Sequence, residues 1–327
     1  MAKLTSLLAG AVALTALAAG AAGAEELSFA HFVPPAHTLT ASTIEPLANG
    51  ISQETEGELT IRVYPGGELG AGPLEQYVRV LQGVADMAWG LQGYTSSQFP
   101  KTMIAELPGV IENDAFGYPA LWAAYDLIKE EYPGTKPLAL WTAEPNIIIM
   151  KDKDVRTPDD LKGLKIRVSG SAAAASVEAL GATPVQMPAN EIYNALQTGL
   201  IDGVITGASA VTDFKIGEVA NSYTLGAPLG RIAFFVVMNQ ARYDGLTDTQ
   251  KAAIDKNSGP SLSNSAETGW NAKANQTIES LKANPDKTVI ELTADEAAAF
   301  GALTMPVTER IVGEVGGENI LKTMQSQ

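Results

Sequence analysis

Cysteine is absent from this chain of 327 residues, and histidine occurs only twice. Without cysteine the chain has no disulfide framework, no thiol nucleophile and no lipidated cysteine that could tether it to a membrane. It also lacks Gly-x-Ser-x-Gly, His-Glu-x-x-His, Walker-type and Gly-x-Gly-x-x-Gly motifs. These absences argue against the common hydrolase, zinc-protease and nucleotide-binding sites.

The two histidines, His31 and His37, lie close together near the N-terminus. A metal site would need further ligands at suitable spacing, and no carboxylate cluster flanks the pair, so a polar loop beside the first strand is the simpler interpretation. Four aspartates lie between residues 152 and 160, but helix capping explains two of them, and the spacing and glycine of a calcium loop are missing. We therefore expect no metal and no cofactor.

Residues 1–24 have the features of an export signal, namely one basic residue, an apolar core rich in Ala and Leu, and a small-x-small end at Ala22–Ala24. A membrane anchor is the alternative, but the core is short and Glu25 and Glu26 follow it at once. We expect cleavage after Ala24, export to the periplasm and a soluble monomer. The net charge of −15 disfavours nucleic acid as a partner.

The rest of the chain alternates between short apolar runs and amphipathic segments, which is typical of α/β domains with largely parallel sheets. About 300 residues suffice for two such domains. No polar linker separates the halves, so strands that cross between the domains, and hence a hinge, are expected. The predicted strands are 27–32, 59–64, 85–90, 138–141, 146–150, 164–168, 184–185, 204–206 and 231–238, and the main predicted helices are 38–54, 73–82, 171–181, 190–199, 261–283 and one beginning near 293.

One arginine stands out in this pattern. Arg167 alternates with Leu164, Ile166 and Val168 along a predicted strand, and the chain then turns into a helix that Ser171 is expected to cap. An arginine at the carboxyl end of a strand, beside the free amides of a helix start, is suited to binding an anion. A structural salt bridge to one of the many carboxylates is an equally good interpretation of the spacing alone.

Five motifs follow one another along the chain, namely Tyr64–Gly70, Leu81–Met87, Leu161–Val168, Glu191–Gly203 and Val236–Asn239. In their order and spacing they resemble the solute receptors of tripartite ATP-independent periplasmic (TRAP) transporters, of the dicarboxylate-receptor type. The resemblance covers essentially the whole mature chain. It implies a two-domain venus flytrap with long C-terminal helices, in which Arg167 pairs with a ligand carboxylate and the loaded receptor delivers to the small and large subunits of a permease.

With that fold in mind, we predict residues 25–145 plus 230–272 as domain I and 146–229 plus 273–327 as domain II.

Departures from members of the family narrow the class of ligand. The sialic-acid receptors carry charged residues a few positions after the Gly-x-x-Asp motif, and this chain lacks them there. Those receptors also have a second arginine where this chain has Asn146-Ile147. Val204–Thr206 replaces the Glu-Trp pair of metal-bridging keto-acid receptors. A sialic acid and a metal-bridged ligand are therefore disfavoured.

We expect a small organic monocarboxylate with an apolar or aromatic body. Core packing is an equally good interpretation for Trp89 and Phe234. The predicted ligand-binding residues are Arg167, Tyr94, Trp89, Leu91, Gln92, Asn146, Thr206, Gly170, Ala189, Phe234 and His31.

Two other functions stay open on the sequence alone. A secreted α/β hydrolase could use His31 or His37 as its base, although no nucleophile motif accompanies either. A ligand-sensing clamshell could also present a surface to a signalling partner, and only adjacent permease genes would distinguish it from a transport receptor.

Overall fold

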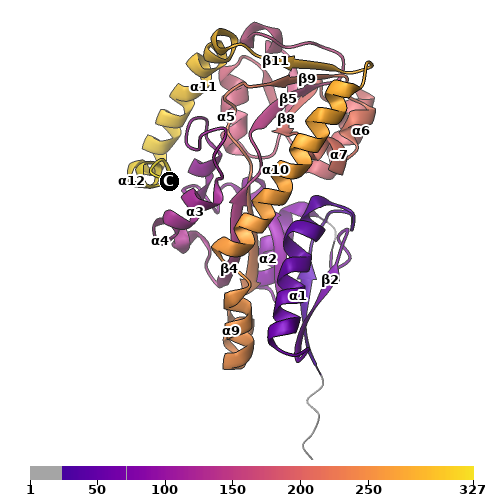
Figure 1. The fold of residues 1–327 in the computed structure, drawn as a ribbon. Helices are drawn as coiled ribbons and strands as arrows, with labels where there is room; N and C mark the ends of the chain where they lie inside the picture. The colour runs from indigo at the N-terminus through magenta and orange to yellow at the C-terminus, as the bar shows by residue number, and fades with distance from the viewer. Residues whose placement is uncertain (1–23, 71) are drawn as a thin grey trace, which may run out of the picture.

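The computed structural model describes residues 24–70 and 72–327. The predicted signal peptide lies outside this part of the chain except for Ala24. Two β-sheets with helices around them form the molecule, the N-terminal one below and the second above in Figure 1. No helix in the described part of the chain is long and apolar enough to span a membrane.

The sheet of domain I has five strands in the order β2-β1-β3-β10-β4. Strands β1, β2 and β3 run parallel, whereas β10 is antiparallel to both β3 and β4. The apolar residues 233–238 of β10 are all buried, as the composition of this run predicts. The strands are β1 (Glu25–Ala30), β2 (Leu59–Tyr64), β3 (Met87–Leu91), β4 (Thr135–Thr142) and β10 (Ala233–Asn239).

The sheet of domain II has six strands in the order β11-β9-β5-β8-β6-β7, and β5 is antiparallel to both of its neighbours. Both sheets are therefore mixed. The prediction of largely parallel sheets is confirmed for β2-β1-β3, β8-β6-β7 and β11-β9, and it is wrong for the pairings of β5 and β10. These two strands are reversed because each enters its sheet directly from the other domain. The strands are β5 (Asn146–Met150), β6 (Lys165–Val168), β7 (Thr183–Gln186), β8 (Gly203–Gly207), β9 (Ser222–Leu225) and β11 (Thr288–Glu291).

The helices pack on both faces of the sheets. A capping box starts α11 at Thr293 and Glu296, as the sequence predicts, and Thr157 and Asp160 form another before a short 3-10 turn. Ser171 does not cap α5; Gly170 is the N-cap, and Ser171 is the first helical residue. The helices are α1 (Glu45–Glu54), α2 (Gln76–Leu81), α3 (Tyr118–Ala123), α4 (Tyr125–Ile128), α5 (Ser171–Ala179), α6 (Ile192–Thr198), α7 (Ser209–Asp213), α8 (Gln240–Asp244), α9 (Asp248–Lys256), α10 (Pro260–Ala283), α11 (Ala294–Val315) and α12 (Glu318–Met324).

Four connections join the domains. The chain crosses from β4 to β5 through residues 143–145, returns between β9 and β10, and crosses again along α10, which runs diagonally over both domains in Figure 1. It returns a last time along α11, whose Val312 packs with the core of domain I. Ile320 and Met324 of α12 pack with the core of domain I, whereas the sequence-based division placed 273–327 in domain II. The division itself stays a prediction.

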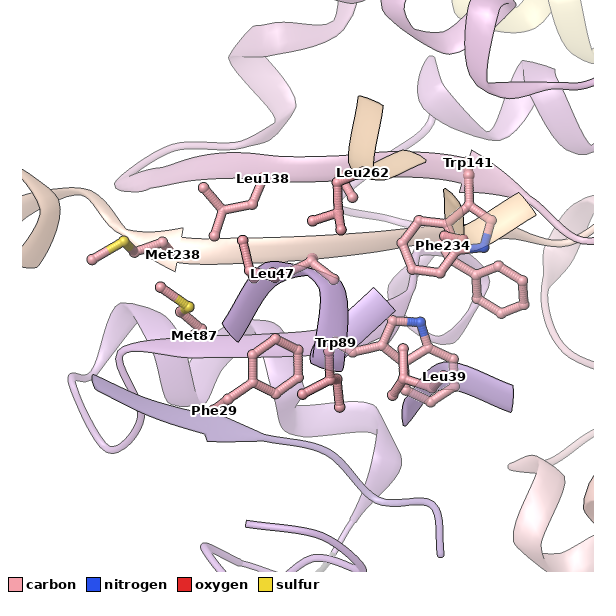
Figure 2. Packing of buried hydrophobic residues seen from close by; sticks show 14 of the residues in the cluster. Phe29, Leu39, Leu47, Met87, Trp89, Leu138, Trp141, Phe234, Met238 and Leu262 are labelled. Carbon is pink, nitrogen blue, oxygen red and sulfur yellow. The ribbon is translucent and has the colours of Figure 1, made fainter. Parts of the chain in front are cut away.

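Each sheet has a separate apolar core on each of its two faces. In domain I, the face beneath α1 and α10 is packed with large side chains, among them Trp89, Trp141 and Phe234 (Figure 2). This aromatic end of the core lies next to the gap between the domains, so it can serve packing and binding at once.

Candidate ligand-binding cleft

A pocket lies between the two domains. Small-molecule sites occur preferentially at such domain interfaces. The wall of the pocket is almost wholly apolar, and residues from both domains contribute to it. The lining residues are Phe32, His37, Trp89, Leu91, Tyr94, Ala143, Arg167, Ala189, Thr206, Gly207, Ser209, Ala210, Asp213, Phe214, Ile232, Phe234 and Trp270.

Arg167 lies in the wall contributed by domain II. It sits on β6 between β7 and β8, and its neighbours Ile166 and Val168 pack into the core on the opposite face of the sheet. Its Nε and Nη2 atoms both donate to the Met187 carbonyl, at 3.0 and 2.8 Å. The guanidinium is thus held in one orientation from the side of β7.

The charge of Arg167 is buried without a counter-ion. The residue is 1% exposed, and it forms no ion pair with a carboxylate of the described residues; Glu191 acts on it only through its charge. Burial lowers the pKa of the guanidinium, while Tyr94 and the more distant Glu191 oppose that shift. Because an unpaired buried cation is costly, the pocket favours an anion at this point.

Contacts across the cleft show that the domains are closed on one another. The Tyr94 hydroxyl accepts a hydrogen bond from the Ala189 amide at 2.8 Å, and it also lies beside Arg167. The Ser96 hydroxyl accepts one from the Ser171 amide at 3.3 Å. This amide at the start of α5, which the sequence suggested would face an anion, therefore contacts domain I instead.

Aromatic rings form the opposite wall. Phe32 stacks on Trp89 with 4.9 Å between ring centroids, and Phe234 lies 5.6 Å from Trp89. Trp270, from the middle of α10, completes this wall at 5.3 Å from Phe234. Trp89 and Phe234 belong both to the domain core and to the pocket wall, so core packing is confirmed and their contact with a ligand stays a prediction.

His37 and Asp213 form the other polar feature of the pocket. His37 Nε2 lies 3.5 Å from a carboxylate oxygen of Asp213, and the pair joins domain I to α7 of domain II. Burial, together with the charge of Lys273, lowers the pKa of His37 to about 3. The imidazole is therefore neutral near pH 7.

The family model of bacterial extracellular solute-binding proteins, family 7, matches residues 29–314. The chain belongs to this family. The C4-dicarboxylate-binding periplasmic protein DctP of Rhodobacter capsulatus is 28% identical to it over 332 residues, which cover 97% of this chain and 96% of that protein.

Solved structures of similar proteins agree with this assignment and confirm the resemblance to TRAP receptors. A TRAP solute-binding protein from a marine metagenome, specific for aromatic acids and solved with 3-hydroxybenzoate, has a TM-score of 0.87 at 27% identity, over 93% of this chain and 98% of that one. A TRAP solute-binding protein from Rhodoferax ferrireducens T118, solved with benzoate, has a TM-score of 0.84 at 28% identity, over 92% and 96%. This family 7 protein is thus a solute receptor of the TRAP type.

Seven of the eleven predicted binding residues line the pocket of this family 7 protein, and four do not. The seven are Arg167, Tyr94, Trp89, Leu91, Thr206, Ala189 and Phe234.

The four others are buried elsewhere. Gln92 donates to the Tyr132 hydroxyl inside domain I, and Asn146 donates to the Leu229 carbonyl at the crossing strands. His31 is buried at the end of β1, where burial lowers its pKa to about 4, and it is not the polar loop residue that the sequence suggested. Gly170 packs against the backbone of Gly93 across the cleft.

Several lining residues escaped the sequence prediction. His37 had been considered only as a metal ligand or a hydrolase base. Asp213, Phe214 and Trp270 lie in segments whose helical periodicity gives no sign of which face meets the other domain. Within residues 24–70 and 72–327, no group of three or more His, Cys, Asp or Glu side chains is placed to hold a metal.

Proposed function

We propose that this TRAP receptor binds a small aromatic monocarboxylate, with the carboxylate on Arg167 and the aromatic body against Trp89, Phe234 and Trp270. The observation that carries the proposal is a buried arginine without a counter-ion in the wall of an aromatic pocket. Charge-assisted hydrogen bonds of about 1.5–3 kcal/mol each, together with enclosure of an apolar body, suffice for micromolar affinity.

The charges of the pocket favour one carboxylate over two. Arg167 is the only arginine or lysine among the described lining residues, and His37 is neutral. A second carboxylate would lack a cation and would meet the buried Asp213. The benzoate and 3-hydroxybenzoate found in the two similar TRAP receptors are acids of the proposed kind.

The remaining features of the proposal come from the chain's N-terminus and family. We expect the signal peptide to be cleaved after Ala24 and the receptor to work in the periplasm as a non-catalytic monomer. It delivers its ligand to the small and large membrane subunits of a TRAP permease. Purification of the exported protein followed by N-terminal sequencing and light scattering checks the cleavage and the monomeric state.

Isothermal titration calorimetry on the mature protein tests the ligand class. We expect benzoate to bind far more tightly than succinate, and Arg167→Met to weaken benzoate binding by about 100-fold or more, because two charge-assisted bonds are lost. Arg62→Met is the matched control. The Arg62 side chain is 61% exposed on the edge strand β2, and it does not line the pocket. Tighter binding of succinate, or undiminished affinity in a folded Arg167→Met variant, would contradict the proposal.

A further inference from the structure

The pair formed by His37 and Asp213 has no role in holding a carboxylate. The Asp213 side chain is only 4% exposed and that of His37 only 3%, yet both lie in the wall of an otherwise aromatic pocket. The 3.5 Å between His37 Nε2 and the carboxylate is longer than a good charge-assisted hydrogen bond. The hydroxyl and amide of Thr38 also interact with the Asp213 carboxylate, but a carboxylate has about four lone-pair sites and so retains capacity to accept another bond.

The tautomer of His37 follows from its other nitrogen. His37 Nδ1 accepts a hydrogen bond from the Leu39 amide at 3.1 Å, so the proton of the neutral ring is on Nε2. The rings of Trp89, Phe214 and Trp270 enclose the imidazole at centroid distances of 5.7, 5.3 and 5.7 Å. The pair thus presents one N–H donor and one carboxylate acceptor to the pocket.

A hydroxyl group complements this arrangement, because it can donate to a carboxylate and accept from an N–H at the same time. The Trp89 ring lies 5.7 Å from that of His37, and its Nε1 atom is buried without a hydrogen-bond partner among the described residues. An ammonium group fits less well. It could not accept from His37, and Lys273 lies close enough to influence the pKa values of both His37 and Asp213.

We propose that His37 and Asp213 form the subsite for a hydroxyl substituent, so that the preferred ligand is a hydroxylated aromatic monocarboxylate. This proposal rests on the proposed function, since Arg167 must hold the carboxylate of the same molecule. A site built to bond a hydroxyl discriminates against the analogue that lacks it, because its own polar groups are then left buried and unpaired. We expect a preference of about 10- to 100-fold in Kd.

Calorimetry with benzoate and its three hydroxy isomers tests the subsite on the wild-type protein. At least one hydroxybenzoate should bind about tenfold or more tightly than benzoate, and the methoxy analogue of that isomer should lose the advantage because it cannot donate. Equal affinities for benzoate and all three isomers would overturn the subsite and leave the proposed function intact. If no aromatic acid binds, both proposals fail.

The variant Asp213→Asn separates the subsite from a general effect on closure, since the pair joins the two domains. We expect it to weaken the hydroxylated acid about tenfold more than benzoate, so that the preference is lost, and Asp126→Asn, at an exposed aspartate, to change neither affinity. An equal loss for both ligands would assign Asp213 to domain closure and overturn the proposal. Tighter binding of 3-(aminomethyl)benzoate than of any hydroxybenzoate would overturn it in favour of a cation site. The wild-type ligand series decides the question if Asp213→Asn does not fold.

Discussion

Two arginines in this protein are equally buried and serve opposite purposes. Arg167 and Arg231 are 1% and 2% exposed, and burial lowers the pKa of both. Arg231 lies 3.6 Å from the carboxylate of Glu267 and donates to the carbonyls of residues 112, 113 and 115. Arg167 has a single carbonyl partner, on Met187, and no carboxylate within reach among the described residues.

The two arginines differ in whether the protein itself supplies a counter-ion for the guanidinium. Arg231 precedes β10, where the chain re-enters domain I, and its bonds tie that crossing to the loop before α3 and to α10. Its charge is compensated whether or not a ligand is present. Arg167 faces the cleft with its charge uncompensated, so it obtains a counter-ion only when an anion enters. Burial alone therefore does not distinguish a structural arginine from a binding one; the partners do.

The largest expected effect comes from removing the compensated arginine. Arg231→Met leaves the Glu267 carboxylate, which is 0% exposed, without its cation, and should lower the free energy of unfolding by about 3–5 kcal/mol. Arg167→Met removes a charge that has no counter-ion and should change the stability of the ligand-free protein by less than about 1 kcal/mol. Chemical denaturation of the two variants and the wild type measures the contrast. If both variants lost the same free energy of unfolding, the distinction between a compensated and an uncompensated arginine would be wrong.

A smaller effect on the free energy of unfolding, which depends on pH, comes from Glu106, a buried carboxyl that is not paired with an arginine. Glu106 accepts a hydrogen bond from the Ala233 amide at 2.9 Å, and burial raises its pKa from 4.5 to about 8. The folded protein therefore holds a proton that the unfolded chain releases above about pH 4.5. Stability from this group is full below pH 4.5 and is lost as pH rises through about 8, by at most about 1.4 kcal/mol per pH unit.

Denaturation midpoints of wild type and Glu106→Gln between pH 5 and 8.5 check this sign. The variant should lose stability less steeply as pH rises, because glutamine has no proton to release. Some slope should remain up to about pH 7, where the buried Glu144 titrates in the same sense. Below about pH 6.5 the two histidines act in the opposite sense and equally in both proteins, because their pKa values of about 4 and 3 in the fold lie below the ordinary value of 6.5. Parallel curves for the two proteins would show that Glu106 is not protonated in the fold.

The smallest expected effect concerns whether Arg167 needs the closed cleft. A Cβ atom on Gly170 would lie 2.7 Å from the Gly93 backbone, so Gly170→Ala should prevent full closure and weaken every ligand by about tenfold, from overpacking of about 1–3 kcal/mol. Calorimetry and small-angle scattering with and without ligand measure both effects. Gly313→Ala is the control, because no atom lies within 4 Å of its added Cβ. Unchanged affinity in Gly170→Ala would mean that Arg167 binds its anion in an open cleft.

The sequence correctly predicted those features that depend only on residues close together in the chain. The capping box at Thr293, the buried composition of β10 and the alternation around Arg167 all correspond to what the structure shows. The site was harder to predict, because its members come from segments far apart in the chain. Asp213 and Trp270 meet the cleft only because two domains close on each other.

The errors have the same origin. Ser171 was expected to cap a helix whose free amides face an anion, but its amide bonds Ser96 of the other domain. Gly170 was assigned to the ligand, although its lack of a side chain serves the approach of Gly93. Contacts across a cleft leave no periodic pattern in either segment, so neither role could be inferred from spacing.

Helix α10 has a mechanical consequence for how the receptor releases its ligand. Its first half packs on domain I and its second half on α7 and β11 of domain II, so the domains cannot rotate apart unless the helix bends or leaves one of them. Trp270 lies at its middle and contacts Trp89, Trp141 and Phe234. Bending of α10 must therefore shift one wall of the pocket. Opening of the domains and loss of contacts to the ligand are thus coupled through the same helix.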